Sequence, residues 1–412
     1  MRKLLSLFFF LSIGACSSDT PDPGSSAPSD FQKELLTQLI TAQPGDVIAI
    51  PAGVHNINRG LSLNVSGVTI RGEGMDKSIL SFKNQVQGAE GLLVSASDFT
   101  IEDLAIEDTA GDALKVNEGR NIVIRRVRTE WTNGPDEKNG AYGIYPVQTE
   151  NVLLEECVAI AASDAGIYVG QSRNVVVRNN RAEYNVAGIE IENTFFADVY
   201  GNVTNNNTGG ILVFNMPDLP QPGHSTRVYQ NTIVANNTDN FGAEGTPVAS
   251  VPAGSGIVIN SNDKVEIFDN DIADNDTANI IISSYYAADF QGSRVQLEEY
   301  DPYPETIYIY GNRLSGGGSS PDRLELKALK VAIFGLGGSL PDILWDGIVN
   351  TEKVDESGSH LPDYRICVDN NDAQILNADL ANDSENIVVG APQHQCRHDK
   401  LPAVVLAAPL GE

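Results

Sequence analysis

The chain is poor in positive charge. Its 27 lysines and arginines stand against 55 aspartates and glutamates, which gives a formal net charge of −28 at pH 7. A surface this acidic repels phosphate backbones and anionic headgroups, so the composition argues against binding to nucleic acid or to anionic membrane surfaces. The same charge makes direct binding of a polyanionic glycan unfavourable unless cations bridge the two molecules.

Histidine, cysteine and aromatic residues are also scarce. Only His55 and His224 of the five histidines precede residue 312, and no Ser/His/Asp set is evident. None of the four cysteines lies in a Cys-x-x-Cys-His motif, which excludes c-type haem attachment. Aromatic residues make up 7% of the chain, whereas glycine occurs 38 times. This balance is typical of many short strands joined by turns.

What the chain does contain is a repeat between residues 143 and 312. Glycine–isoleucine pairs recur there at spacings of 23, 22, 22 and 46 residues. Each unit carries three short apolar runs separated by polar turns. This pattern predicts an all-β chain folded as a parallel β-helix, with one coil per unit. The pairs are Gly143-Ile144, Gly166-Ile167, Gly188-Ile189, Gly210-Ile211 and Gly256-Ile257.

Asparagine recurs in register with these pairs. Most units have an asparagine thirteen residues after the isoleucine and another five residues later. Stacked asparagines can bond to one another from coil to coil, so we expect two buried ladders. Cys157 occupies the first ladder's position one unit earlier, which predicts that it is buried too. The ladder residues are Asn180, Asn202, Asn231 and Asn270, and Asn185, Asn207, Asn236 and Asn275.

The amino-terminal segment has the features of an export signal. Arg2 and Lys3 precede an apolar run, Leu4 to Ile13, that is too short to span a bilayer. Ile13-Gly14-Ala15-Cys16 resembles the bacterial lipobox, which implies cleavage after residue 15 and lipidation of Cys16; an ordinary signal peptide is the alternative. Ser17 in place of an aspartate favours the outer membrane of the cell envelope. Residues 16–29 are predicted to be a flexible tether.

The rest of the chain divides into a capped coil and an appendage. Ser29 and the apolar spacing of residues 31–40 predict a short helix that caps a β-helix over residues 30–318. Breaks in the period place protruding loops on the coil. Beyond residue 318 the period stops, so 319–412 is expected to be an irregular carboxy-terminal appendage, with a possible helix at 322–334. The loops are 129–141, 215–226, 238–254 and 284–304.

Cys367 and Cys396 are expected to lie in this appendage, outside the coil. In an exported protein such a pair is expected to form a disulfide. The alternative is a metal site made by His394, Cys396 and His398, although no fourth ligand is evident.

One outward face of the coil gathers candidate functional residues. Alignment of the units places Lys115, Tyr145, Tyr168 and Glu190 in one column, with Glu192 in the next and Asp164 just before its strand. Adjacent coils lie ~4.8 Å apart, so these residues would form one surface patch. Tyrosines beside paired carboxylates suit sugar binding and acid–base catalysis, with Glu190, Glu192 and Asp164 as catalytic candidates. The alternative is an ordinary solvated face of an acidic protein.

The aspartate-rich run at residues 269–276 suggests a calcium-binding site. Two of its members, Asn270 and Asn275, are already assigned to the interior ladders, so only the aspartates are free to face outward. The spacing matches neither the EF-hand nor the glycine–aspartate nonapeptide pattern. No cofactor is therefore predicted, with Ca²⁺ as the alternative.

Four coil segments carry a family resemblance. Residues 139–148, 164–171, 185–193 and 207–214 resemble exported bacterial parallel β-helix proteins, and the likeness covers about residues 44–312. Many members of this family carry lipoprotein signals, and their genes often neighbour a di-haem c-type cytochrome. The resemblance implies a right-handed β-helix lipoprotein and suggests the cytochrome as a partner.

A more distant similarity is to pectate lyases, polygalacturonases and alginate epimerases. The chain lacks the Asp-Pro-His-Asp motif of the epimerases and the Arg-Ile-Lys motif of the polygalacturonases, so the mechanisms of those enzymes cannot be transferred. Two functions therefore remain open. One is an envelope protein with a carbohydrate-binding or carbohydrate-processing face, and the other is a non-catalytic protein that docks an envelope partner.

Overall fold

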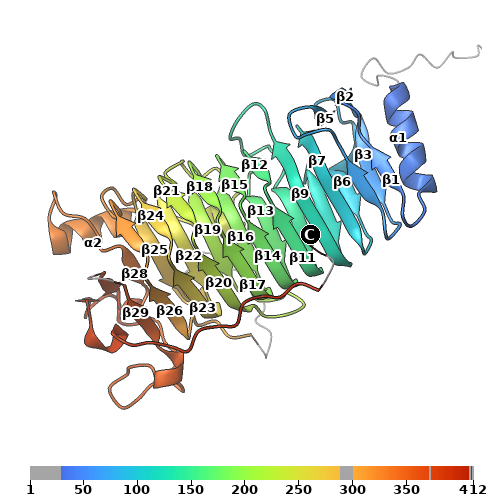
Figure 1. Cartoon of the computed structure of the whole chain (residues 1–412). Coiled ribbons are helices and arrows are strands. Elements are labelled where there is room, and N and C mark those ends of the chain that lie inside the picture. Colours follow the sequence, from blue (N-terminus) through green and yellow to red (C-terminus); the bar gives the residue numbers. More distant parts are fainter. Residues whose placement is uncertain (1–28, 288–299, 371–372, 408–409, 411–412) are drawn as a thin grey trace, which may run out of the picture.

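The computed structural model describes residues 29–287, 300–370, 373–407 and 410. The chain forms a right-handed parallel β-helix, as predicted, with the helix α1 (Asp30–Thr41) at one end and irregular segments at the other (Figure 1). The predicted export signal, Cys16 and most of the tether fall in residues 1–28, outside the described residues, and stay predictions. No helix among the described residues is long and apolar enough to cross a membrane.

Successive coils pair in parallel to build two sheets, which we call A and B, and the last strand of sheet B, β31 (Val388–Val389), joins it antiparallel. Sheet B forms one face of the coil and carries the candidate residues. Its strands are β3 (Arg59–Leu63), β6 (Gln87–Val94), β8 (Leu114–Asn117), β10 (Tyr142–Val147), β13 (Ala165–Gly170), β16 (Ala187–Glu192), β19 (Gly209–Phe214), β22 (Ser255–Asn260), β25 (Ala278–Ser283), β28 (Ile343–Trp345), β30 (Ile375–Asn377) and β31 (Val388–Val389).

Sheet A covers the other two faces, and its long strands β7 (Phe99–Glu107) and β9 (Arg120–Glu130) cross both. One face holds β1 (Val47–Ala49), β4 (Thr69–Arg71), β11 (Glu150–Glu155), β14 (Arg173–Arg178), β17 (Phe195–Tyr200), β20 (His224–Tyr229), β23 (Asp263–Phe268), β26 (Ile307–Tyr310) and β29 (Ile366–Asp369). The next holds β2 (Gly53–Asn56), β5 (Ser78–Ser81), β12 (Val158–Ile160), β15 (Arg181–Glu183), β18 (Val203–Asn205), β21 (Thr232–Val234), β24 (Asp271–Ala273) and β27 (Arg313–Ser315).

The interior of the coil is a stack of aliphatic side chains. Ile144 pairs with Ile167, Ile167 with Ile189, and Ile189 with Ile211, and all are fully buried. Each isoleucine therefore packs on the coil before and the coil after it. Burial of this apolar column drives the stacking.

The two asparagine ladders form as predicted. In the first, the side-chain amide of Asn180 donates to Oδ1 of Asn202 at 2.9 Å, and that of Asn202 donates to Oδ1 of Asn231 at 3.0 Å. The ladder continues through Asn270 to Asn312. Cys157 is buried at its start, and its backbone N–H donates to Oδ1 of Asn180. The second ladder runs through Asn185, Asn207, Asn236 and Asn275.

The helix α1 closes the amino-terminal end of the coil. Its N-cap is Ser29, whose hydroxyl accepts a hydrogen bond from the N–H of Gln32. Leu35 and Leu39 are buried and belong to the same apolar core as the first coils. The helix thus covers core side chains that an open end would expose.

The coil continues further than the sequence period. Three strands beyond residue 318 extend the sheets. Strand β28 pairs in parallel with β25, β30 pairs with β28, and β29 pairs with β26. Segments that do not follow the repeat, including the helix α2 (Leu324–Phe334), separate these strands and hide their period. The short 3-10 helices η1 (Pro247–Ser250), η2 (Tyr285–Ala287), η3 (Pro362–Tyr364), η4 (Leu380–Asn382) and η5 (Pro392–His394) lie in such connections.

Cys367 and Cys396 form the predicted disulfide, but Cys367 does not lie outside the coil. It is in β29, in register with Tyr308 of β26, and is fully buried. The alternative metal site at these residues is wrong because Cys396 is in the disulfide. His394 and His398 instead each bond to a backbone carbonyl, of Ile366 and Arg365 respectively.

After Cys396 the chain turns back along sheet A as an extended segment, residues 397–407, which we call the strap. Figure 1 shows it in red, crossing the strands from β29 towards β11. Lys400 lies over the Tyr310 ring, the N–H of Val404 donates to Asp198, and the N–H of Ala407 donates to Asn151. The carboxy-terminal segment is therefore bound to coils far from its own.

Candidate active site on the outer face of sheet B

The predicted outward columns form on sheet B. Lys115 is in register with Tyr145, and Glu190 is in register with both Tyr168 and Leu212. The adjacent column places Gly170 opposite Glu192. The repeat therefore brings the predicted residues together as expected.

Their exposure differs from the prediction of a solvated patch. Tyr168, Glu190 and Glu192 point out of the coil but are only 4%, 2% and 8% exposed. Apolar side chains from the insertions pack over this face in a second hydrophobic cluster. The covering residues include Met216, Leu219, Val248, Val251, Tyr285 and Tyr300. The expectation of exposure is wrong because the loops cover this face of the sheet.

Three tyrosines pack together at the edge of the cluster, and two of them, Tyr142 and Tyr145, reach solvent. The ring centroid of Tyr142 lies 4.5 Å from that of Tyr145 and 4.6 Å from that of Tyr168, and Tyr145 meets Tyr168 edge-on at 4.9 Å. The ammonium of Lys115 lies 4.7 Å from the Tyr145 ring centroid. Tyr142, Tyr145 and Lys115 are partly exposed, so this rim is where solvent reaches the cluster.

Behind the rim, burial raises the pKa values of the carboxyl groups. Burial, with the nearby charges of Glu192 and Asp112, raises the pKa of Asp164 to about 8. Burial, together with Asp164 and Glu192, raises the pKa of Glu190 well above its usual range. Glu190 Oε2 is buried without a hydrogen-bond partner. Each of these buried carboxyls disfavours the ionisation of the others, and with a pKa of about 8 Asp164 is mostly protonated at neutral pH.

Sequence reasoning missed two members of the cluster, Tyr142 and Asp112. The backbone N–H of Tyr142 donates to Asp112, and its hydroxyl bonds to Asp164. Burial raises the pKa of Asp112 to about 6, although Lys115 opposes the shift. Tyr142 and Asp112 each stand two residues before the inward-facing residues Ile144 and Leu114, which pair with each other. Extending the alignment of the units by two residues would therefore have found both positions.

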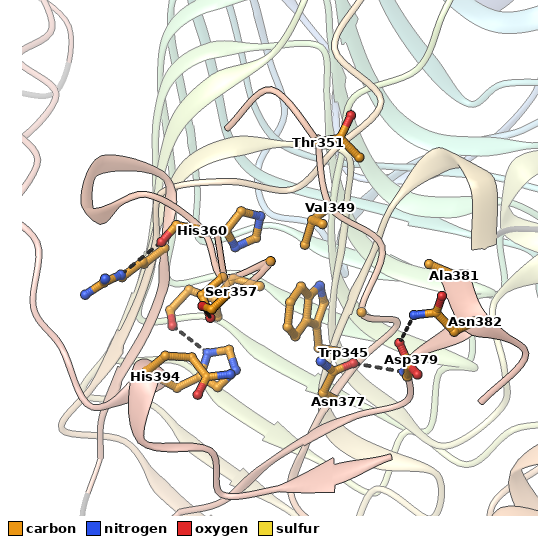
Figure 2. A pocket seen from close by; sticks show the side chains of 16 residues that line it. Trp345, Val349, Thr351, Ser357, His360, Asn377, Asp379, Ala381, Asn382 and His394 are labelled. Atoms are coloured by element: carbon orange, nitrogen blue, oxygen red, sulfur yellow. Dashed lines mark hydrogen bonds between the residues drawn. The ribbon is translucent and has the colours of Figure 1, made fainter. Parts of the chain in front are cut away.

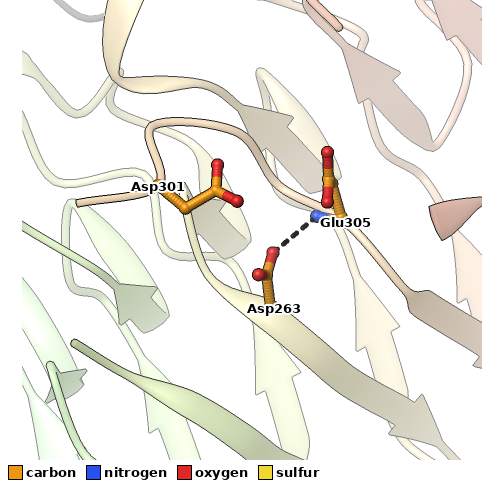
Figure 3. Close-up of side chains that lie close together, drawn as sticks. All are labelled: Asp263, Asp301 and Glu305. Atoms are coloured by element: carbon orange, nitrogen blue, oxygen red, sulfur yellow. Dashed lines mark hydrogen bonds between the residues drawn. The ribbon is translucent and has the colours of Figure 1, made fainter. Parts of the chain in front are cut away.

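The 269–276 run does not gather ligands for a cation in the described structure. Asn270 and Asn275 occupy the ladders as predicted, and Asp271 pairs with Arg313. Within the described ranges, one group of three acidic side chains has carboxylate oxygens within 4.8 Å of one another, Asp263, Asp301 and Glu305 (Figure 3). Lys353 Nζ lies 2.8 Å from Asp301 and 2.6 Å from Glu305, and this lysine neutralises much of their charge.

Solved structures of other proteins are similar to this chain at low sequence identity. Among solved structures, the chain resembles the Azotobacter vinelandii mannuronan C-5 epimerase AlgE6 A-module, with 17% identity, a TM-score of 0.47, and coverage of 78% of this chain and 87% of that one. It also resembles a DFA-IIIase from Arthrobacter chlorophenolicus A6, with 11% identity, a TM-score of 0.45, and coverage of 74% and 83%. For a GH136 lacto-N-biosidase from Eubacterium ramulus the identity is 14%, the TM-score is 0.41, and the coverage is 66% and 62%.

Among curated proteins, no sequence matches this chain significantly. Residues 56–220 match the family model described as "Right handed beta helix region". That match covers the coils that carry Lys115, Tyr145, Asp164 and Glu190. The match spans 165 of the 412 residues and agrees with the right-handed parallel β-helix that the stacked strands of both sheets form.

Proposed function

We propose that this protein binds a saccharide at the rim formed by Tyr142, Tyr145 and Lys115 and exchanges protons with it through Asp164 and Asp112. The observation that carries the proposal is that Tyr142 of the rim bonds to both Asp112 and Asp164, while burial raises the pKa of Asp164 to about 8 and that of Asp112 to about 6. Two carboxyls shifted apart in this way can serve as an acid and a base at the same pH.

The rim has the chemistry that a sugar requires. Tyrosine rings offer an apolar face to the C–H groups of a pyranose, and tyrosine hydroxyls and carboxyls bond to its hydroxyl groups. Lys115 is 3.9 Å from Asp112 and sets a positive charge beside that carboxylate. A saccharide lying on the rim would reach Asp112 first and the deeper Asp164 next.

The two carboxyls have different roles in this proposal. At pH 7 Asp164 is mostly protonated, so it can donate a proton to an oxygen of the bound sugar. Asp112 is mostly ionised and can accept one. Glu192 acts through Asp164, because its charge opposes the ionisation of that carboxyl.

Panels of neutral and acidic oligosaccharides test the proposal by calorimetric binding and by mass spectrometry of products. Tyr145→Ala should weaken binding at least tenfold. Asp164→Asn and Asp112→Asn should retain binding and lose turnover by ~10²-fold or more, as expected for removal of an acid or base. Glu183→Gln, which removes a carboxylate of the same coil on sheet A, is the matched control and should behave as wild type. Absence of binding across the panel, or Asn variants as active as the control, would contradict the proposal.

A further inference from the structure

A cavity lies at the carboxy-terminal end of the coil, away from the tyrosine–carboxyl cluster. It has a volume of about 410 Å³ and is lined by segments around Trp345, His360 and His394 (Figure 2). Trp345 ends β28, and His394 ends η5 next to the Cys367–Cys396 disulfide. The volume falls in the range of small-molecule sites, ~300–1,000 Å³.

Three nitrogen atoms in the wall of this cavity have no hydrogen-bond partner. They are Nε1 of Trp345, Nε2 of His360 and Nε2 of His394, and all three are buried. The side chains surround one space: the Trp345 ring centroid lies 5.7 Å from that of His360 and 5.4 Å from that of His394 (Figure 2). The three residues are only 5%, 6% and 5% exposed. Buried polar groups are almost always paired, so three unpaired atoms around one cavity indicate a ligand.

The hydrogen-bonding character of two of these atoms is fixed. The indole nitrogen of Trp345 can only donate. His394 Nδ1 lies 2.9 Å from the carbonyl oxygen of Ile366. Because a carbonyl only accepts, Nδ1 carries the hydrogen, which leaves Nε2 as an acceptor. One wall of the cavity therefore offers a donor and an acceptor, the combination that a hydroxyl group satisfies.

The cavity is lined by charges of opposite sign, Arg365 and Asp379, and so favours neither an anion nor a cation. Burial lowers the pKa of His394 and lowers that of His360 to about 4, so both rings are neutral at pH 7. The charges of Lys353 and Arg365 act on His360 in the same direction, and both would repel a cation. The indole N–H of Trp345 would also face that cation. Among the described residues, no third His, Cys, Asp or Glu lies close enough to bind a metal ion together with the two histidines.

We propose that the cavity enclosed by Trp345, His360 and His394 binds a neutral, hydroxyl-rich small molecule of the monosaccharide or polyol class. The Trp345 ring supplies an apolar wall for the carbon skeleton, and the three nitrogens bond to hydroxyl groups. The site does not depend on the proposed function of the tyrosine–carboxyl cluster.

The indole N–H signals of the two tryptophans provide the test. Trp131 is an internal control, because its Nε1 already donates to the carbonyl of Thr109 at 2.8 Å. The ¹⁵N-labelled protein is titrated with glucose, galactose, mannitol and glycerol, and Trp345→Phe assigns the two signals. We expect a saturable shift of the Trp345 signal with at least one of these compounds and no shift of the Trp131 signal.

Substitutions then locate the site. His360→Phe and His394→Phe keep an aromatic ring but remove the unpaired nitrogen, and each should weaken binding at least tenfold. His55→Asn, at the far end of the coil, should leave affinity unchanged. Asp164→Asn should also leave it unchanged, and this result would show that the cavity binds independently of the site on sheet B. If both phenylalanine variants fail to fold, the wild-type titration still decides.

Three outcomes would overturn the proposal. They are no saturable Trp345 shift with any neutral compound, equal shifts of both tryptophans, and folded phenylalanine variants with unchanged affinity. A saturating response to Zn²⁺ in the absence of any response to sugars would assign the cavity to a metal ion instead.

Discussion

The phenol of Tyr168 donates a hydrogen bond to the carboxylate of Glu192 on the following coil. Gly170 makes this contact possible. It stands in register with Glu192, and a Cβ at this position would lie 2.3 Å from Cε1 of Tyr168 and 2.5 Å from its hydroxyl oxygen. The Tyr168 ring therefore occupies the space that any other residue would fill. Because Gly170 has no side chain, Tyr168 can orient the carboxylate of Glu192 on the next coil.

Gly170→Ala should displace the Tyr168 ring and break its bond to Glu192. Loss of a hydrogen bond to a buried carboxylate costs ~1–3 kcal/mol, so the unfolding free energy should fall by about that amount. Saccharide binding at the rim should weaken as well, since Tyr168 packs on Tyr142 and Tyr145. Chemical denaturation measures the first effect. Gly337→Ala is the control, because a Cβ there meets nothing within 4 Å; equal stability of the two variants would refute the role of Gly170.

Buried protonated carboxyls should make the protein less stable as pH rises. The pKa of Asp164 is about 8 in the folded chain, whereas an unfolded aspartate titrates near ~3.9. Between these values the unfolded chain has released a proton that the folded chain still holds. The unfolding free energy contributed by Asp164 therefore decreases from about pH 4 to about pH 8 and then levels off.

Thermal unfolding at a series of pH values checks this sign. Other groups also titrate, and the lowered pKa of Glu155 acts in the opposite direction, so the difference between variant and wild type is the relevant quantity. Asp164→Asn should be more stable relative to wild type at pH 8 than at pH 5. The surface variant Asp136→Asn should follow wild type. A constant difference between Asp164→Asn and wild type at every pH would count against the buried, protonated carboxyl.

Asn202 should be critical for the stability of the middle coils. Its Oδ1 accepts from the backbone and the side chain of Asn180, and its amide donates to Val177 and Asn231. Asn202→Ala leaves several buried groups unpaired at ~1–3 kcal/mol each, so we expect a loss of roughly 3 kcal/mol or more in the unfolding free energy. Asn205→Ala in the same coil is the control, because Oδ1 of Asn205 has no partner. Similar losses for the two variants would argue against the ladder.

The repeat explains which parts of this molecule could be predicted. Ile167 and Asn180 each recur at the coil period, so the core, both ladders and the outward column of Tyr145, Tyr168 and Glu190 follow from counting residues. The disulfide partners could be paired because Cys157 belongs to the first ladder. The core, the ladders and the outward column all repeat along the axis of the coil.

Features formed by non-repeating segments could not be predicted. Met216, Val251 and Tyr285 cover the site, and nothing in their own segments indicates where each folds back. The strands β28 to β30 are separated by such segments, which is why the coil continues past residue 318 without a visible period. The pKa values of Asp164 and Asp112 depend on burial in the folded chain, which is the largest cause of both shifts. The shifted pKa values of these two carboxyls therefore became visible only in three dimensions.

The disulfide should hold the strap in place. Cys396 is bonded to β29 and directly precedes the strap, whose far end contacts Asp198 and Asn151. The bridged residues are 29 positions apart, for which loop-closure entropy gives a stabilisation of about 3–4 kcal/mol. Because Cys367 lies in β29, Cys396→Ser should loosen the last coil as well as the strap.

Hydrogen exchange should then be faster at the amides of Val404 and Ala407 and in β29, and unchanged in β13 and β16. Arg397→Gln, which removes an exposed ion pair with Asp369, should have little effect on these amides. Unchanged protection of Val404 and Ala407 in Cys396→Ser would show that the strap is held by its own contacts with sheet A.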